Sequence, residues 1–538
     1  MAGMEAMAKK RISQQTFDET VRENVDDFEM EKDEALADAI QQFKSQGVDL
    51  TNIDTSGTDR SAERDELANA LEVIKTAKDA LHDGKPIAAE ECITAMAALR
   101  SACAGGPKTE LDADPTVADE STPAPARAGP GVTTNKSIIA MAKGPDSLAA
   151  FLPFVALAPA ALDTLCVVCE DSVENRDSFP SIAIAVLAKL LDASMADGDT
   201  VRRCCTTIAV LTTRTEDLKA MFVKKEVGGL RQLLTALKTH GADPLVVIAA
   251  CQALRSVCSF DDLRRDFSGA YDASRAAVEL GTIPELITAF RAFPDNGEVI
   301  CALCSAMKVM ACNDDAVQQI QAGGGVPIII KCLEDFPDSA PVCQRAAAVV
   351  RNLSGNDDVK TTLCQGNCLP LLLAATQSHM EDAALAEHVM ASLAAMALRR
   401  PTNCERIVAL NGIRQITLCM RRFPKVAAVQ RACCLTVRNL VGRCPELMDP
   451  LLGENMEELL RAAGKVPGSV DAAYAALRDL KLEATMVTMN ADGQIQVGVE
   501  EFGARKSAFN PVYDDGDANI EDKMSAAAQS PAELGYNM

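Results

Sequence analysis

Apolar residues recur every three or four positions along most of the chain, which is the spacing of amphipathic helices. Within that pattern one short phrase occurs six times: a turn containing Gly or Asn, followed by a run of apolar residues. The third residues of the six copies lie 53, 43, 43, 44 and 43 residues apart. A period in the low forties on helical patterning predicts a solenoid of stacked helical repeats, which presents a binding surface rather than a reaction centre. These third residues are Leu230, Ile283, Val326, Leu369, Ile413 and Met456.

Each copy of the phrase is expected to begin a helix. Three copies carry a proline in the expected first turn, at Pro284, Pro327 and Pro370. A missing backbone N–H costs little at that place. The helix is expected to end at a Phe-Pro pair, and a further helix follows it. These pairs begin at Phe293, Phe336 and Phe423.

The helix after the Phe-Pro pair has two distinct faces. When the repeats are aligned on a small residue, larger apolar residues come three and six positions later, and at 100° per residue the three positions share one face. We expect that face to be buried and the fourth and fifth positions to lie on the opposite face. The small residues are Cys205, Cys251, Cys304, Ala347, Ala391 and Cys434. The opposite face includes Arg255, Lys308, Arg351 and Arg438 at the fourth position, and Asn352 and Asn439 at the fifth.

Several of these segments resemble armadillo repeats. Arg351-Asn352-Leu353-Ser354 and Arg438-Asn439-Leu440 are similar to the end of the third helix of such a repeat. In that superfamily the asparagine lines a concave groove and bonds the backbone of an extended peptide. Residues 11–18 and 45–50 resemble the N-terminus of the armadillo repeat-containing protein 6 family, and residues 475–480 resemble the close of its last repeat. The resemblance covers roughly residues 9–53 and 138–484 and implies a right-handed, all-α armadillo/HEAT-type solenoid.

The importin-type groove of this superfamily pairs a tryptophan with the asparagine, four positions apart on the same helix. The chain contains no tryptophan, and asparagine fills only two of the six groove positions. The stacking platform that such a groove needs is therefore missing. An importin-like transport receptor is for this reason a less favoured alternative.

The sequence divides into four regions. Residues 1–104 are expected to form an acidic helical N-terminal region with a helical hairpin at 61–104, and residues 105–137, rich in Pro and Gly, a disordered linker. Residues 138–487 hold about six to seven repeats, the first of them degenerate. Residues 488–538 form an acidic, mostly disordered tail, in which Ile495, Val497 and Val499 alternate behind Asp492-Gly493 as a weak hairpin signal.

Charge separates the ends from the repeats. The net charge of the 538 residues is −23, of which residues 1–137 carry −12, residues 488–538 carry −6 and the 350 residues between them only −5. Nothing resembles the basic stripe of a nucleic-acid-binding protein. The uncharged stretch 147–162 is short for a membrane span and contains two prolines, so a buried helical pair is favoured and no membrane partner is expected.

The twenty cysteines do not form a pattern that predicts chemistry. Cys166-x-x-Cys169 and Cys301-x-x-Cys304 are 135 residues apart, so they cannot easily close one zinc site in a solenoid whose repeats contact only their neighbours. Four of the cysteines instead occupy the small-residue column, where packing explains them. Reduced thiols favour the cytoplasm, with the nucleus as a second compartment. The sequence shows no nucleophile–base pair and no phosphate loop, so we expect no enzyme, no cofactor and no metal.

These observations predict a protein–protein interaction scaffold. We expect an extended acidic or phosphorylated segment to bind along the concave groove, with one acidic end of the chain competing for it. The basic column has a second interpretation, as a solvated face whose long side chains cover neighbouring helices. A structural adaptor that uses the convex faces and the N-terminal helices in a larger assembly is the main alternative, and the oligomeric state is left open. The expected groove contacts are Arg255, Lys308, Arg351, Asn352, Arg438 and Asn439.

Overall fold

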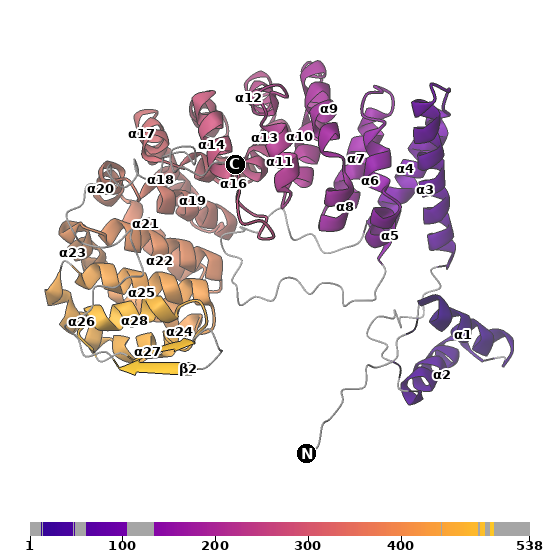
Figure 1. Cartoon of the computed structure of the whole chain (residues 1–538). Coiled ribbons are helices and arrows are strands. Elements are labelled where there is room, and N and C mark those ends of the chain that lie inside the picture. Colours follow the sequence, from indigo (N-terminus) through magenta and orange to yellow (C-terminus); the bar gives the residue numbers. More distant parts are fainter. Residues whose placement is uncertain are drawn as a thin grey trace, which may run out of the picture. The chain divides into compact units, whose positions relative to one another are not determined.

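The computed structural model is a stack of three-helix units, and it confirms the all-α solenoid (Figure 1). The third helix is the longest in each unit. Third helices of successive units pack on one another without interruption from α7 to α28. The structure describes residues 12–48 apart from 13, 29 and 47, residues 61–104, residues 134–482 apart from 443, and residues 485–489 and 495–499.

Eight such units follow one another in the described part of the chain, against the six to seven that the sequence predicts. The stretch expected to hold one degenerate repeat, residues 138 to about 200, contains most of α5, all of α6 to α9 and the start of α10, which belong to two units, α5–α7 and α8–α10. Neither carries the repeated phrase, so the sequence period does not separate them. The units are α5 (Asn135–Met141), α6 (Gly144–Ala149) and α7 (Ala158–Cys169); α8 (Val173–Ser178), α9 (Ser181–Ala193) and α10 (Gly198–Thr212); α11 (Glu216–Phe222), α12 (Gly229–Thr239) and α13 (Pro244–Val257); α14 (Ala270–Glu279), α15 (Thr282–Ala292) and α16 (Gly297–Met310); α17 (Asp314–Ala322), α18 (Gly325–Asp335) and α19 (Ala340–Leu353); α20 (Asp357–Gln365), α21 (Cys368–Ser378) and α22 (Ala383–Ala397); α23 (Pro401–Ala409), α24 (Gly412–Arg422) and α25 (Ala427–Val441); and, after the 3₁₀ turn η2 (Pro445–Leu447), α26 (Met448–Gly453), α27 (Met456–Ala463) and α28 (Val470–Asp479).

The repeated phrase begins the second helix in the six units that carry it, as predicted. The residue just before that helix has a left-handed backbone, with φ between 60° and 92°, in five of the six copies. Only Gly, and less readily Asn, adopts this conformation without strain, which explains why the phrase opens on these residue types. The five residues are Gly228, Gly281, Gly324, Asn411 and Asn455.

The aligned apolar column forms the core between third helices. Five of the six small residues are fully buried, and the sixth, Ala391, is partly exposed. All twenty cysteines are free thiols, and burial raises the pKa of Cys251 above its usual range. Within the described ranges, no group of three or more His, Cys, Asp or Glu side chains could hold a metal ion. The column therefore confirms packing as the role of its cysteines.

The hairpin predicted at 61–104 is present and extends the stack. Its helices are α3 (Ser61–His82) and α4 (Ala89–Cys103), and they contact α6 and α7 respectively. Arg100 Nη1 donates to Ala160 O at 3.3 Å, and Lys78 forms an ion pair with Asp146. The boundaries drawn at residues 104, 137 and 487 stay predictions.

Two pairs of short elements do not belong to the three-helix units. Near the N-terminus, α1 (Gln14–Asp26) packs on α2 (Lys32–Ser45) through Phe17 and Phe43, whose ring centroids are 5.9 Å apart. Near the C-terminus, β1 (Thr485–Met489) pairs antiparallel with β2 (Ile495–Val499), which confirms the hairpin signal in an otherwise helical fold. Most of the predicted linker, 105–133, and the tail from residue 500 lie outside the described residues.

The uncharged stretch 147–162 belongs to the core of the stack. It runs from α6 into α7, and Leu148, Phe151, Leu152 and Leu162 are fully buried. This confirms the buried helical pair. Among the helices that the structure describes, none combines the length and the apolar composition that a membrane span requires.

Replacing Gly412 with Ala is expected to lower the free energy of unfolding by about 1–3 kcal/mol. A Cβ at the start of α24 would lie 2.5 Å from Ile407 Cγ2 and 2.7 Å from the Ile407 carbonyl oxygen, so the backbone must shift. Urea unfolding followed by circular dichroism measures the change. Gly453→Ala is the matched control, because a Cβ there meets nothing within 4 Å. Equal stability of the two variants would contradict the predicted clash.

Candidate functional site

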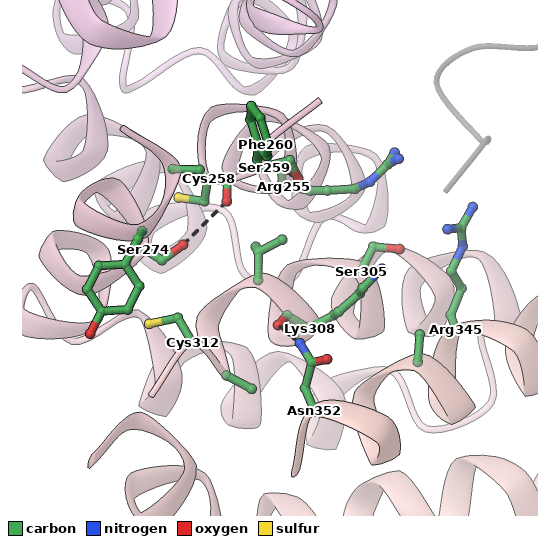
Figure 2. A pocket seen from close by; sticks show the side chains of 15 residues that line it. Arg255, Cys258, Ser259, Phe260, Ser274, Ser305, Lys308, Cys312, Arg345 and Asn352 are labelled. Carbon is green, nitrogen blue, oxygen red and sulfur yellow. Dashed lines mark hydrogen bonds between the residues drawn. The ribbon is translucent and has the colours of Figure 1, made fainter. Parts of the chain in front are cut away.

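The third helices α13, α16 and α19 enclose a hollow of about 320 Å³ on the face opposite their buried column (Figure 2). Arg255 comes from α13, Lys308 from α16, and Arg345 from α19. Ser305 and Asn352 are among the other polar residues of the lining. Three cationic side chains from three successive repeats thus surround one space, which we call the basic hollow.

Figure 2 shows the guanidinium groups of Arg255 and Arg345 on the same side of the basic hollow. Both side chains are partly exposed, as is Lys308. Cationic groups that line one hollow attract anionic groups of a ligand. The arrangement can therefore bind carboxylate or phosphate groups, and guanidinium can do so through two parallel hydrogen bonds.

The structure brings together only three of the six predicted groove residues. Arg255, Lys308 and Asn352 line the basic hollow. Arg351, on the same helix as Asn352, instead contacts the next repeat, and Arg438 and Asn439 lie on α25, far along the stack. The predicted column is thus not a uniform ladder of ligand contacts.

The two arginines outside the hollow bridge neighbouring repeats. Arg351 Nη1 lies 2.7 Å from Oε1 of Glu387 on α22, and this carboxylate is only 4% exposed. Arg438 Nε lies 3.0 Å from Oδ2 of Asp479 on α28. Each pair joins the third helix of one unit to that of the next. We infer that these arginines stabilise the stack, a role that neither interpretation of the basic column includes.

The two asparagines also bond across the stack. Asn352 Nδ2 donates to the carbonyl oxygen of Lys308 at 2.9 Å, and Asn439 Nδ2 donates to that of Ala394 at 2.8 Å. Both acceptors lie in the last turn of the preceding third helix, and Ala394 O also accepts from the backbone N–H of Leu398 at 3.2 Å. The amide group that the resemblance assigns to a peptide ligand is therefore engaged within the chain.

Arg345 was not among the predicted residues. It lies two positions before the small residue Ala347. Ala348, three positions after Arg345 and so about one helical turn away, also lines the hollow. The aligned columns started at the small residue and did not include this position. Arg345 would have been found by extending the alignment one turn toward the N-terminus.

A second missed feature is the segment between α13 and α14. Twelve residues, 258–269, connect these helices, whereas three residues connect α16 to α17 and α19 to α20. The segment accounts for the one long interval of 53 residues in the repeat period. Its residues Cys258, Ser259 and Phe260 contribute to the wall of the basic hollow.

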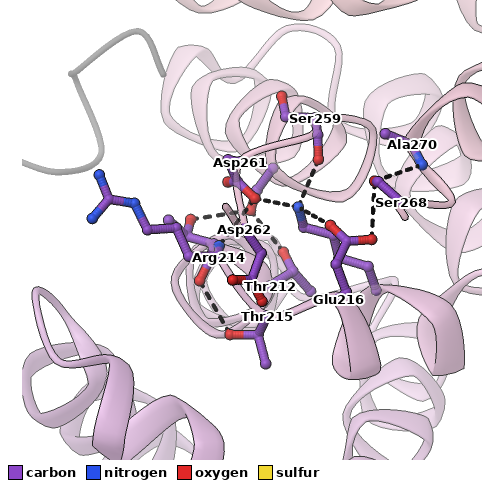
Figure 3. A network of polar contacts seen from close by, with 12 residues as sticks. Thr212, Arg214, Thr215, Glu216, Ser259, Asp261, Asp262, Ser268 and Ala270 are labelled. Atoms are coloured by element: carbon purple, nitrogen blue, oxygen red, sulfur yellow. Dashed lines mark hydrogen bonds and ion pairs between the residues drawn. The ribbon is translucent and has the colours of Figure 1, made fainter. Parts of the chain in front are cut away.

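A buried ion network holds this segment in place (Figure 3). The Lys219 side chain, 4% exposed, lies 3.0 Å from Oε1 of Glu216, donates to Ser259 O at 2.6 Å and contacts Asp261. The backbone N–H of Arg214 donates to Asp261 Oδ1 at 3.1 Å. The start of the segment is thus tied to α11 and to the residues that precede it.

Asp262 and Arg264 continue the network. Arg264 Nε donates to Asp262 Oδ1 at 2.7 Å, and its Nη1 donates to Asp177 Oδ2 at 2.7 Å. Burial alone would raise the pKa of Asp262, but the hydrogen bonds from Arg264 outweigh it and the pKa is lowered. A lowered pKa means that this carboxylate stabilises the fold above its unfolded pKa and that the contribution is lost as the pH falls through the folded value.

Comparison with known proteins shows similarity to one family. Residues 9–69 match the model of the armadillo repeat-containing protein 6 N-terminal domain. Armadillo repeat-containing protein 6 of Homo sapiens is 29% identical over 326 residues, covering 59% of this chain and 58% of the human protein. That of Pongo abelii is 29% identical over 330 residues, with the same coverage. These matches support the armadillo repeat-containing protein 6 family as the one that the chain resembles.

The alignment with these armadillo repeat-containing protein 6 relatives spans less than two thirds of their length. The matched N-terminal domain of the family contains α1, α2 and the beginning of α3. A crystal structure of an engineered protein is similar to the chain with a TM-score of 0.54 and 17% identity, covering 86% of this chain and 98% of that one. At this identity the likeness shows the fold alone.

Proposed function

We propose that this protein is a non-catalytic interaction scaffold that binds an acidic segment of a partner protein at the basic hollow. The observation that carries the proposal is the convergence of Arg255, Lys308 and Arg345, from three successive repeats, on one hollow. An armadillo-type fold supports such a role, because stacked repeats form an extended surface for partners. Reduced, buried thiols are consistent with work in the cytoplasm or nucleus.

Binding is centred on these repeats rather than spread along the whole stack. Arg351 and Arg438 already face carboxylates of the chain, so they add little net positive charge for a ligand. The hollow gathers cationic side chains from three successive repeats, in a repeat region whose net charge is only −5.

Charge reversal at the hollow tests the proposal. The probes are short fluorescein-labelled peptides of alternating Asp and Gly, or Lys and Gly, titrated with the full chain and followed by fluorescence anisotropy. We expect the double variant Lys308→Glu, Arg345→Glu to weaken binding of the Asp peptide by about tenfold or more, about 1.4 kcal/mol. The Lys peptide should show no such loss.

Lys331→Glu is the matched control, because Lys331 is an exposed residue of α18 that does not line the hollow. It should leave binding of the Asp peptide unchanged. If the Asp peptide does not bind, or binds the double variant and the wild type equally, the proposed site is wrong. Partner binding through other faces of the stack, as in a structural adaptor, would then be favoured.

A further inference from the structure

The segment 258–269 and the first turn of α14 carry an unusual concentration of exposed aromatic side chains. The whole chain has 15 Phe and 4 Tyr, and three of these aromatic residues lie within twelve positions here. Phe260 is 50% exposed, Tyr271 53% and Phe267 90%. Exposed aromatic groups gathered on one segment are typical of binding surfaces, because burying each of them against a ligand is favourable.

Two of these aromatic side chains face the basic hollow and one does not. Phe260 and Tyr271 line it, whereas Phe267 is absent from the lining. Val309, Ala311 and Ala348 add further apolar surface to the same space. Phe260 and Tyr271, from the segment 258–269 and α14, form an apolar wall of the hollow, whereas the cationic side chains come from the third helices.

The apolar wall is held in a defined position. Ser259, directly before Phe260, accepts a hydrogen bond from Lys219, and Asp261, directly after it, is an ion-pair partner of the same lysine. Ser268 Oγ donates to Glu216 Oε2 at 3.0 Å and accepts from the backbone N–H of Ala270 at 3.1 Å, next to Tyr271. Because the wall is ordered before a ligand arrives, little conformational entropy is lost on binding.

The size of the hollow limits what the apolar wall can hold. Its volume of about 320 Å³ lies at the lower end of the range for ligand sites. That volume suits one bulky side chain, with neighbouring residues of the same ligand left at the rim. Since Arg255, Lys308 and Arg345 line the same hollow, the ligand residues next to that side chain should be anionic.

We propose that the basic hollow is a pocket for a single aromatic side chain of the bound segment, with carboxylate or phosphate groups on the adjacent residues contacting the three cationic side chains. The ligand is thus an aromatic–acidic motif of a protein partner rather than any acidic stretch. The inference rests on the proposed function and adds to it a preference for an aromatic residue in the ligand. This preference comes from the segment 258–269, which makes one repeat ten residues longer than the others.

Peptide pairs test this specificity. A fluorescein-labelled peptide with one Phe between Asp residues is compared with the same peptide carrying Ala, and a third peptide carries phosphoserine in place of the Asp residues beside Phe. On the wild-type chain we expect the Phe peptide to bind about tenfold more tightly than the Ala peptide, as burial of one aromatic side chain implies. The phosphoserine peptide shows which anion the cationic side chains prefer.

The variant Phe260→Ser is expected to abolish the difference between the Phe and Ala peptides. Phe267→Ser, in the same segment but outside the lining, should preserve it, and circular dichroism confirms that both variants are folded. If the Phe and Ala peptides bind the wild type equally while the dependence on Lys308 and Arg345 persists, the aromatic pocket is wrong and the acidic-segment site stands. If no Asp peptide binds, the proposed function fails and this inference fails with it.

Discussion

Lys219→Met is expected to lower the free energy of unfolding by about 3–5 kcal/mol, the usual cost of removing one partner from a buried ion network. The change leaves the carboxylates of Glu216 and Asp261 facing each other without their cation, at side chains that are 11% and 7% exposed. It also removes the hydrogen bond to Ser259 O. Urea unfolding measures the loss, read as a shift of the first transition because repeat stacks need not unfold in one step.

Limited trypsin digestion localises the effect. Arg264 and Arg265 lie within the segment 258–269, so release of this segment should speed cleavage there before the rest of the stack is cut. The control is Lys225→Met, which removes an exposed lysine from the turn that follows α11 and should change neither stability nor cleavage. A second variant, Lys219→Met with Asp261→Asn, should recover part of the lost stability, because one unpaired charge is removed. Unchanged stability and cleavage of Lys219→Met would contradict the role assigned to the network.

Arg351→Glu is expected to lower the free energy of unfolding by about 3 kcal/mol or more, because it places a second carboxylate against buried Glu387. Oε2 of Glu387 also lies 2.7 Å from Nδ1 of His388, which is fully buried. The two carboxylates would therefore share a site with little access to water. Chemical denaturation measures the loss.

Arg422→Glu provides the comparison for Arg351→Glu. It breaks an ion pair with Glu381 whose side chains are both largely exposed, so the loss should stay below about 1 kcal/mol. Charge reversal at Arg351 thus reports on stacking and is a poor probe of ligand binding. If Arg351→Glu keeps wild-type stability yet abolishes binding of the Asp peptide, Arg351 is a ligand contact after all.

The difference between cationic residues that line the hollow and arginines that pair within the stack also shows what could be predicted at the site and what could not. Aligning the third helices correctly placed Arg255 and Lys308 on the face opposite the buried column. The alignment could not show that Arg351 meets Glu387, because the two residues are 36 positions apart and lie on adjacent repeats. The cationic residues at the fourth position look alike in sequence. Their surroundings differ, because each one lies beside different residues of the next repeat.

The unequal repeat interval is a second example. The spacing of 53 residues showed that one repeat is longer, but not where its extra residues lie or what they contact. The position of these extra residues depends on Lys219, which contacts Asp261. Lys219 is 42 residues before Asp261 and lies on α11, the first helix of the unit that precedes the segment. Long-range ion pairs of this kind have no signature in a single sequence, since Lys, Asp and Glu are common on every helix surface.

By itself, the sequence determined the repeat architecture, the start of six second helices and the buried face of the six aligned third helices. These features follow from local rules: a helix repeats every 3.6 residues, and Gly or Asn is needed where the backbone is left-handed. Only the tertiary structure decided which cationic side chains pair within the stack and which surround the basic hollow. Ion pairs and hollows arise between repeats, where residues far apart in the chain meet at distances that no period along the sequence encodes.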